Sequence, residues 1–419
     1  MTALLESLQT AFSNPEPVKN AALDQAIAVG LPTQRNEQWK YTSLRALSAR
    51  RFTAPAVELA IINAETLKTV SAIPSPRIVF INGIFDPAIS SLSNLPEGFS
   101  VQTEVSSHSS DQSRFANAYE IFARLNTVIA RQGMQINVGK NIAVDNCLHA
   151  VFVSVNTGQD HAIHYRHHIA LDENAKLDLI EHHISHDSHQ HLANHFCEIS
   201  LNDKAKLSHA RIQQDDIGAS HFLRTEACLQ SNASYRRLDL ELGAHLSRHD
   251  LQVKLLGDGA SLHANGSFIA SGRRHVDTRM DIQHSAKNTE CHLVWRGLAT
   301  ERGRAVFHGG ILIEKAADGT VAHLSNKNLL LSDNAEIDTQ PVLVIHADEV
   351  VASHGATVGR LDAGHLFYLR ARGIPEAQAK AMLTNAFCKE TLQVLANDEL
   401  INLVAPSLEK LLQAIEVSA

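Results

Sequence analysis

The chain has 419 residues, of which 44% are hydrophobic and 20% charged, and this composition is that of a globular protein rather than a disordered or membrane-embedded chain. Its length predicts two or three structural regions. The 37 basic and 45 acidic residues give a net charge of −8, which argues against binding to nucleic acid or to an anionic membrane surface.

The cysteines and the N-terminus indicate a protein of the reducing cytoplasm. The five cysteines are an odd number with no two closer than 31 positions, which argues against a disulfide framework and against paired-cysteine metal sites. Glu6 stands where a signal peptide would carry basic residues, and no apolar run approaches the ~20 residues that span a bilayer. We therefore expect free thiols and a cytoplasmic protein.

The first 135 residues show helical spacing interrupted by one short strand. Helices are expected from Thr2 to Phe12 and from Pro17 to Gly30, and Arg77–Gly83 predicts a strand that runs into a turn. The serine-rich segment Ser90–Ser113 is interpreted as a loop. A further helix, which ends before Gly133, is expected where one face carries Phe115, Tyr119, Phe122, Leu125 and Ile129.

A repeat of short strands begins near residue 136. Its recurring phrase is a polar residue or glycine, then alanine, any residue and an apolar or aromatic residue, and it occurs at 174–177, 204–207, 232–235 and 259–262. The four alanines lie 30, 28 and 27 residues apart, and similar phrases occur at 334–337 and 355–358. A repeat of this length predicts a parallel β-helix over residues 136–360, with a β-sandwich as the alternative.

Helical spacing returns after Leu366. Glu376–Phe387, which follows Pro375, and Ser407–Val417 predict two helices of a C-terminal helical region spanning residues 361–419. The expected fold is therefore mainly β, with a parallel β-helix flanked by N-terminal and C-terminal α-helical regions.

The common signatures of catalysis are missing. The sequence has no phosphate-binding GxxxxGK[ST] loop, no GxGxxG between a strand and a helix, no GxSxG elbow and no HExxH. A solenoid without these motifs favours a non-catalytic binding or scaffolding protein. The enzyme alternative is a cytosolic β-helix enzyme that acts on a small substrate through carboxylates and histidines on the solenoid face.

The chain contains 25 histidines, and ten of them lie among the 35 residues from His161 to His195. His189 and His191 would share one strand face, as would His182 and His186, so a borderline metal ion could be bridged there. This pattern makes a histidine-rich metal-binding protein a second alternative. The competing interpretation is that these rings line the polar side of strands and turns.

A second dense segment runs from Asn326 to Phe387 and predicts the last turn of the solenoid. Pro341 is expected to lie outside the strand ladder, and Ser353-His354-Gly355 is expected to form a turn. Because the end of a solenoid exposes unpaired strand edges, His354 would lie where a partner docks. A catalytic triad of Ser353, His354 and Asp348 is not expected, because residues so close in sequence rarely assemble one.

The Asn326–Phe387 segment closely resembles the C-terminal core of the SufB/SufD family, whose members belong to the SUF machinery of iron–sulfur cluster assembly. Arg35–Thr42 resembles the N-terminal signature of the family, as does Phe122-x-x-Leu-Asn followed by Gly133-x-x-Ile-x-Val. Ser332-Asp333 and His354-Gly355-Ala356 resemble the SufD branch, because SufB-like sequences carry a cysteine before the aspartate and His-Glu-Ala at the histidine.

This resemblance implies a right-handed parallel β-helix that pairs end to end with SufB. In the family the histidine matching His354 acts at the SufB interface, together here with Ser353 and Gly355, near a SufB cysteine where a transient iron–sulfur cluster forms. His354 could ligate iron there or stabilise sulfide charge. Some relatives have a cysteine two residues before this histidine, where this chain has Ala352, which argues against a further cluster ligand at that position.

The resemblance also implies that the C-terminal helical region binds the ATPase SufC. The residues expected at that contact are Phe367, Tyr368, Arg372, Gly373, Ile374, Pro375 and Phe387, and the alternative is that they only cap the solenoid. No cofactor is expected to bind the isolated chain tightly, although a flavin could take part in the complex. The cluster Trp39-Lys40-Tyr41 could form an anion or flavin site or could pack helices. The isolated chain could form a homodimer through its open solenoid end.

Overall fold

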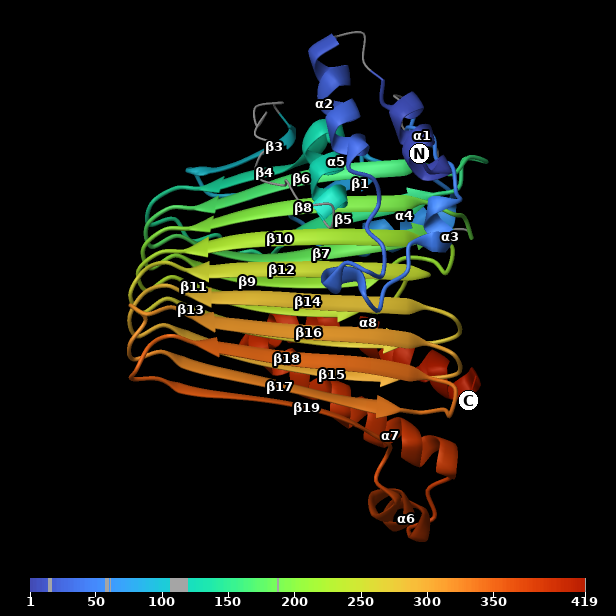
Figure 1. Ribbon diagram of the computed structural model, residues 1–419, viewed down its shortest axis with the longest axis vertical. Helices are drawn as coiled ribbons and strands as arrows, with labels where there is room; N and C mark the ends of the chain where they lie inside the picture. Colours follow the sequence, from blue (N-terminus) through green and yellow to red (C-terminus); the bar gives the residue numbers. More distant parts are fainter. Residues whose placement is uncertain (14–16, 57–59, 61, 106–119, 187, 419) are drawn as a thin grey trace.

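Two sheets stacked face to face form a long solenoid, with helices at both ends of the chain packed on its outside (Figure 1). Their strands pair in parallel except for β1 with β2 and β3 with β4, which pair antiparallel. This arrangement is that of a computed structural model, which describes residues 1–13, 17–56, 60, 62–105, 120–186 and 188–418. Each turn of the solenoid contributes one strand to each sheet, so that odd-numbered and even-numbered strands separate along most of its length. The predicted parallel β-helix is confirmed, and the sandwich alternative is wrong.

The ten-stranded sheet has the order β19-β17-β15-β13-β11-β9-β7-β5-β1-β2, and the nine-stranded sheet has the order β18-β16-β14-β12-β10-β8-β6-β4-β3. The strands of the first sheet are β1 (Arg77–Ile81), β2 (Ile84–Phe85), β5 (Leu148–Val155), β7 (Lys176–His186), β9 (Lys206–Gln214), β11 (Ser234–Glu241), β13 (Ser261–Ala270), β15 (Glu290–Ala299), β17 (Val321–Leu330) and β19 (Val351–Gly359). Those of the second are β3 (Phe99–Glu104), β4 (Gln132–Val138), β6 (Ala162–Leu171), β8 (Leu192–Leu201), β10 (Ser220–Leu229), β12 (Leu246–Leu255), β14 (His275–His284), β16 (Arg304–Ile313) and β18 (Glu336–Ile345).

The recurring phrase marks one corner of each turn. Asn174, Lys204, Asn232 and Gly259 all have positive φ, between 56° and 70°, a conformation that asparagine and glycine adopt at low cost. The alanine that follows each of them is buried against the solenoid core. Asn288 and Gly319 continue the same corner, but threonine replaces the alanine there, which is why the alanine pattern did not reveal these two turns.

The last two phrases do not belong to this corner. Residues 334–337 lead into β18 of the other sheet, and residues 355–358 lie inside strand β19 rather than in a turn. Pro341, expected outside the ladder, lies within β18, where it pairs in register with Gly309 of β16. An edge strand tolerates proline because its missing N–H can face away from the sheet.

The N-terminal helices pack on the outer face of the nine-stranded sheet. They are α1 (Ala3–Ala11), α2 (Pro17–Ala28), η1 (Glu37–Trp39), α3 (Arg45–Ser48) and α5 (Ile121–Ile129), whereas α4 (Ala64–Ser71) packs against β1 and β5. Helices α1 and α2 and strand β1 confirm the predictions, while Phe115 and Tyr119 of the third predicted helix lie outside the described residues. The predicted loop Ser90–Ser113 contains β3, in which burial alternates from residue to residue, and its residues 106–113 lie outside the described residues.

The C-terminal helices are α6 (Ala363–Ala371), α7 (Glu376–Lys389), η4 (Glu390–Leu395) and α8 (Asp398–Ser418). Apolar side chains of η4 and α8 pack on outward-facing residues of the ten-stranded sheet, including Ala210, Ile212 and Leu238. The predicted helix Ser407–Val417 is the second half of α8, which runs through Pro406. The divisions at residues 135 and 360 stay a prediction, and β4 crosses the first of them.

The helices of the described chain include none that is both long and apolar enough to cross a membrane. All five cysteines are free.

Candidate functional site

The end of the solenoid opposite the N-terminal helices presents open strand edges. Strand β19 is the last strand of one sheet and β18 is the last strand of the other (Figure 1). Every residue of β19 is exposed or half-buried, whereas most strands in the middle of the solenoid are largely buried. Unpaired backbone groups and exposed side chains of this kind form a surface that another β-structure can extend.

His354 lies in the middle of β19 and is exposed, so the predicted turn at Ser353-His354-Gly355 is wrong. The strand form arises because β19 pairs in parallel with β17, which places His354 opposite Leu324 and Gly355 opposite Ser325. Gly355 has no neighbouring atom within 4 Å of where a Cβ would lie. The three predicted residues are therefore contiguous, open to solvent and placed on the free edge.

A row of histidines leads along the ten-stranded sheet to this edge. His263, His292 and His323 occupy equivalent positions on β13, β15 and β17, and adjacent ring centroids are 5.1 Å apart. The Nδ1 atom of His323 lies 2.7 Å from the Oγ atom of Ser353. This row was not predicted, although its spacing of 29, 31 and 30 residues up to Ser353 matches the solenoid repeat.

Exposed apolar residues surround the free edge. Val351 is 61% exposed, and the other exposed large apolar residues of the last two strands are Val344, Ile345 and Val358. Single exposed valines are common on protein surfaces, but a group of exposed apolar residues at a strand edge is not. This end of the molecule therefore has the character of an interface.

A helical hairpin extends beyond the solenoid end. Helix α6 has no buried residue, and its Phe367 and Tyr368 side chains are 73% and 56% exposed. Arg372 stacks on the Tyr368 ring at 4.8 Å. The chain then reverses at Gly373, whose φ of 87° favours glycine, and Pro375 caps the start of α7. Ile374 is half-buried in this turn.

Phe387 is separated from the other predicted contact residues. It lies near the C-terminal end of α7, where it packs against the cluster formed by η4, α8 and the ten-stranded sheet. The guanidinium of Arg296 lies 5.8 Å from its ring centroid. The structure therefore places Phe387 in the packing of the C-terminal helices rather than on the exposed hairpin.

The histidine-dense segment 161–195 lies largely inside the protein. Seven of its histidines are buried, namely His161, His164, His167, His183, His189, His191 and His195. His189 and His191 stack at 4.6 Å but precede strand β8 rather than sharing its face. The predicted pair His182 and His186 cannot be placed as a pair, because the side chain of His186 lies outside the described residues.

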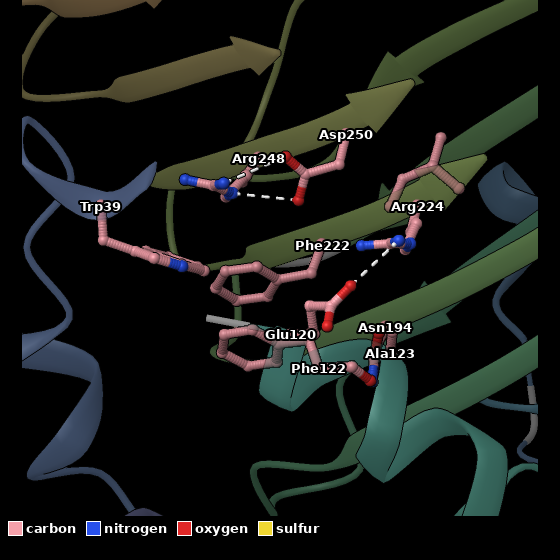
Figure 2. Close-up of a pocket in the computed structure, with 10 residues that line it drawn as sticks. Trp39, Glu120, Phe122, Ala123, Asn194, Phe222, Arg224, Arg248 and Asp250 are labelled. Atoms are coloured by element: carbon pink, nitrogen blue, oxygen red, sulfur yellow. Dashed lines mark hydrogen bonds and ion pairs between the residues drawn. The ribbon is translucent and has the colours of Figure 1, made fainter. Parts of the chain in front are cut away.

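Trp39 packs helices onto the solenoid, and the anion or flavin site considered for the Trp39-Lys40-Tyr41 cluster stays a prediction. Its ring contacts Phe122 and Phe222 at centroid distances of 6.0 and 6.3 Å, and the Arg248 guanidinium lies 3.9 Å from it (Figure 2). The cavity beside these side chains has a volume of about 20 Å³, which is room for about one water molecule. Tyr41 is exposed outside this contact.

A buried ionic network fills the middle turns of the solenoid. The Asp239 carboxylate accepts hydrogen bonds from Arg211 and Arg237 at 2.8 and 2.7 Å, and Arg211 also donates to Glu241 at 2.8 Å. Glu241 in turn accepts a hydrogen bond from Thr278 at 2.6 Å. Burial alone would raise the pKa of Asp239, but the charges of Arg237, His249 and Arg211 together outweigh it and hold that pKa far below its usual range. The network joins β9 to β11 within the ten-stranded sheet and reaches β14 of the other sheet through Thr278.

Known families match nearly the whole chain. Residues 153–387 match the family described as the SufBD core domain of the SUF system for FeS cluster assembly, and residues 9–150 match the SufBD protein N-terminal region. The chain is 31% identical over 388 residues to the iron–sulfur cluster assembly protein SufD of Escherichia coli, with 92% of this chain and 90% of that protein covered.

Two further relatives have similar coverage. An iron–sulfur cluster assembly SufBD family protein of Synechocystis is 30% identical, with 89% of this chain and 86% of that protein covered. Protein ABCI7, chloroplastic, of Arabidopsis thaliana is 22% identical, with 95% and 87% covered.

Proposed function

The chain belongs to the SufBD family of iron–sulfur cluster assembly proteins and resembles its SufD members, and from this premise we propose that it is a non-catalytic scaffold that pairs with SufB and the ATPase SufC. A role in cluster assembly follows from the family. We further propose which surface binds each of the two partners and what His354 does at the SufB surface.

The single observation that carries the proposal is the open end of the solenoid. Strands β18 and β19 end the two sheets with free edges, and Val344, Val351 and Val358 are exposed there. A partner with the same fold could continue both sheets by strand pairing while covering these valines. We assign this end to SufB because a solenoid of the same repeat presents complementary edges.

His354 would then lie at the centre of the pairing surface. Its side chain is exposed in the separate chain, so a partner strand would enclose it together with Ser353. A neutral imidazole can ligate iron, and a protonated one can stabilise sulfide or persulfide charge. The iron–sulfur cluster is the cargo of this interface and is held only until it is transferred.

The hairpin of α6 and α7 is the proposed SufC contact. A nine-residue helix without a buried side chain gains little from its own chain, because isolated short helices are marginal in water. The exposed rings of Phe367 and Tyr368 offer the aromatic anchors that dominate many interfaces. Movement of SufC during its nucleotide cycle would reach the solenoid through α7, whose Phe387 packs on the C-terminal helical cluster.

Charge substitutions at the two surfaces test this assignment. Val351→Asp should abolish co-purification with SufB and retain SufC, because a carboxylate would be desolvated at the strand edge. The matched control is Leu256→Asp, since Leu256 is 42% exposed but lies after β12, away from the free edge. SufB binding that survives Val351→Asp, or that is lost equally with Leu256→Asp, would overturn the assignment of the edge.

Phe367→Asp should show the reverse pattern, with loss of SufC and retention of SufB. Ile217→Asp is its control, because Ile217 is 43% exposed in a connection of the middle solenoid. If Phe367→Asp leaves SufC bound, the alternative that α6 and α7 only cap the solenoid is favoured.

A further inference from the structure

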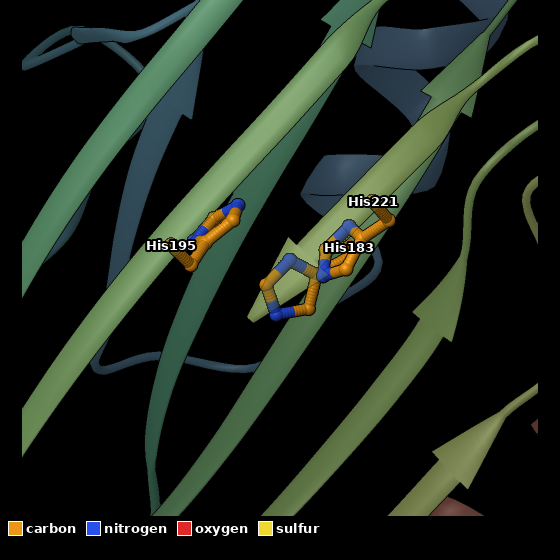
Figure 3. Close-up of side chains that lie close together, drawn as sticks. All are labelled: His183, His195 and His221. Atoms are coloured by element: carbon orange, nitrogen blue, oxygen red, sulfur yellow. The ribbon is translucent and has the colours of Figure 1, made fainter. Parts of the chain in front are cut away.

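We propose that His183, His195 and His221 bind one divalent metal ion inside the solenoid, at a site separate from the free edge. The three rings come from strands of both sheets, with His183 on β7 of one sheet and His195 and His221 on β8 and β10 of the other (Figure 3). One ligand nitrogen from each ring lies within 4.8 Å of the others.

The sheet register explains why these three rings meet. His195 pairs with Leu223 and His221 pairs with Ala193, so the two histidines occupy diagonal positions on neighbouring strands. Their rings stack at 5.2 Å, and the His183 ring approaches both edge-on, at 4.7 and 4.9 Å. All three residues are at most 2% exposed. The rings therefore surround a common point in the interior.

Two of the three rings, those of His183 and His221, lie beside a buried carboxylate, and each has a ring nitrogen without a hydrogen-bond partner. The Nε2 atom of His183 lies 3.1 Å from Glu181, and the Nδ1 atom of His221 lies 3.0 Å from Asp215. The Nδ1 atom of His183 and both ring nitrogens of His221 are buried and have no hydrogen-bond partner, so the Asp215 carboxylate lies near the His221 ring without a hydrogen bond to it. The Glu181 carboxylate holds the far nitrogen of His183, as carboxylates commonly do for histidines that bind metals.

The third ring is oriented by His167, whose Nδ1 atom accepts a hydrogen bond from the Met134 backbone N–H at 3.1 Å. The Nε2–H of His167 therefore donates to the Nδ1 atom of His195 at 3.2 Å, and His195 would give up its Nε2 proton on binding the ion. Burial lowers the pKa of His183 to about 4 and that of His195 well below its ordinary value. The lowered pKa values favour the neutral form of His183 and His195, which is the form that coordinates a metal.

The charge of the surroundings suits a divalent cation. The Glu181 and Asp215 carboxylates are both buried, Glu181 beside His183 and Asp215 beside His221. Glu181 contacts His183 and His209, and Asp215 contacts imidazoles, the Gln213 amide and the Ser185 hydroxyl. Among the described residues neither carboxylate contacts a lysine or an arginine, so one ion of charge +2 would balance two buried negative charges.

Three imidazoles favour a borderline ion such as Zn²⁺ or Fe²⁺ over Mg²⁺ or Ca²⁺. A tetrahedral ion with nitrogens at ~2.0–2.1 Å would hold them about 3.4 Å apart, so binding would draw the rings closer together. Because the site is enclosed, the ion would enter as the turns close during folding and would leave slowly. The sequence pairs His189–His191 and His182–His186 did not point here, and His221 lies outside the histidine-dense segment.

Metal analysis of the separately purified chain tests the site and does not depend on SufB or SufC. The wild-type chain, expressed with zinc and iron in the medium and dialysed against a chelator, should retain about one ion per chain. His195→Gln and His221→Gln should lose most of it. His284→Gln is the matched control, because His284 is also buried but bonds Thr289 in a later turn, and it should keep the ion, as should His354→Ala.

A second measurement holds even where a variant fails to fold. Wild-type chain unfolded in denaturant with chelator and refolded with Co²⁺ should show the visible absorption of a four-coordinate histidine site. Wild-type chain that refolds but retains neither zinc, iron nor cobalt would overturn the proposal. So would full metal content in folded His195→Gln and His221→Gln, and loss of the ion in His354→Ala would place the metal at the free edge instead.

Discussion

Removal of the Asp239 carboxylate should destabilise the solenoid far more than removal of an exposed carboxylate. Asp239 is fully buried on β11 and accepts hydrogen bonds from Arg211 at 2.8 Å and from Arg237 at 2.7 and 2.9 Å. In Asp239→Ala, Arg237 would lose the one carboxylate that accepts its hydrogen bonds among these contacts. Arg211 would keep its hydrogen bond to Glu241. Breaking a buried pair in this way costs about 3–5 kcal/mol, because a guanidinium is left charged and unpaired.

The measurement is urea unfolding followed by circular dichroism, with Glu336→Ala as the control. Glu336 pairs with Arg304 at 3.2 Å, but both side chains are more than half exposed, so its loss should cost about 0–1 kcal/mol. The reasoning is refuted if Asp239→Ala unfolds within about 1 kcal/mol of wild type, or if both substitutions have the same effect.

Three further predictions concern acid, backbone packing and the free edge. Burial lowers the pKa of His167 to about 4, against ~6.5 when unfolded, so the unfolded chain binds more protons and stability should fall between pH 6.5 and 4. At pH 5 this amounts to about 2 kcal/mol for this ring, and melting curves that do not change from pH 7 to pH 5 would contradict it. Gly266→Ala should destabilise by about 1–3 kcal/mol, because its Cβ would overlap Trp295, whereas Gly355→Ala meets open space and should melt like wild type. His354→Ala should leave the complex with SufB and SufC assembled but lower its yield of iron–sulfur cluster several-fold. His292→Ala should not lower the cluster yield, because His292 is a half-exposed histidine two strands from the edge. Equal yields from both variants would show that the His354 ring is dispensable.

The solenoid could be predicted because its signal is repeated. Residues such as Asn174 and Asn232 must take positive φ at every corner, and each is followed by a small residue that fits against the core. The alanine pattern missed the corners where another residue follows the positive-φ position. Thr289 and Thr320 follow that position in two turns, and their hydroxyl groups form a hydrogen bond of 2.9 Å. Residues 355–358 of β19 match the corner pattern although they lie in a strand, because glycine and alanine also suit an exposed edge strand.

The exposed site was easier to anticipate than the buried one. The position of His354 at the solenoid end follows from chain order, although its strand conformation depends on pairing with β17 that no local pattern reveals. The convergence of His183 with His195 and His221 depends on how two sheets face each other across the interior. The spacing of residues along the sequence indicates which residues pair within one sheet. It does not indicate which residues of the two sheets face each other.

Co-expression of this chain with SufB and SufC, followed by size-exclusion chromatography, tests the scaffold assignment most directly. The account predicts one stable complex that contains all three proteins, formed through the β18–β19 edge and the α6–α7 hairpin. Elution of this chain apart from both partners under conditions where all three are folded would contradict it.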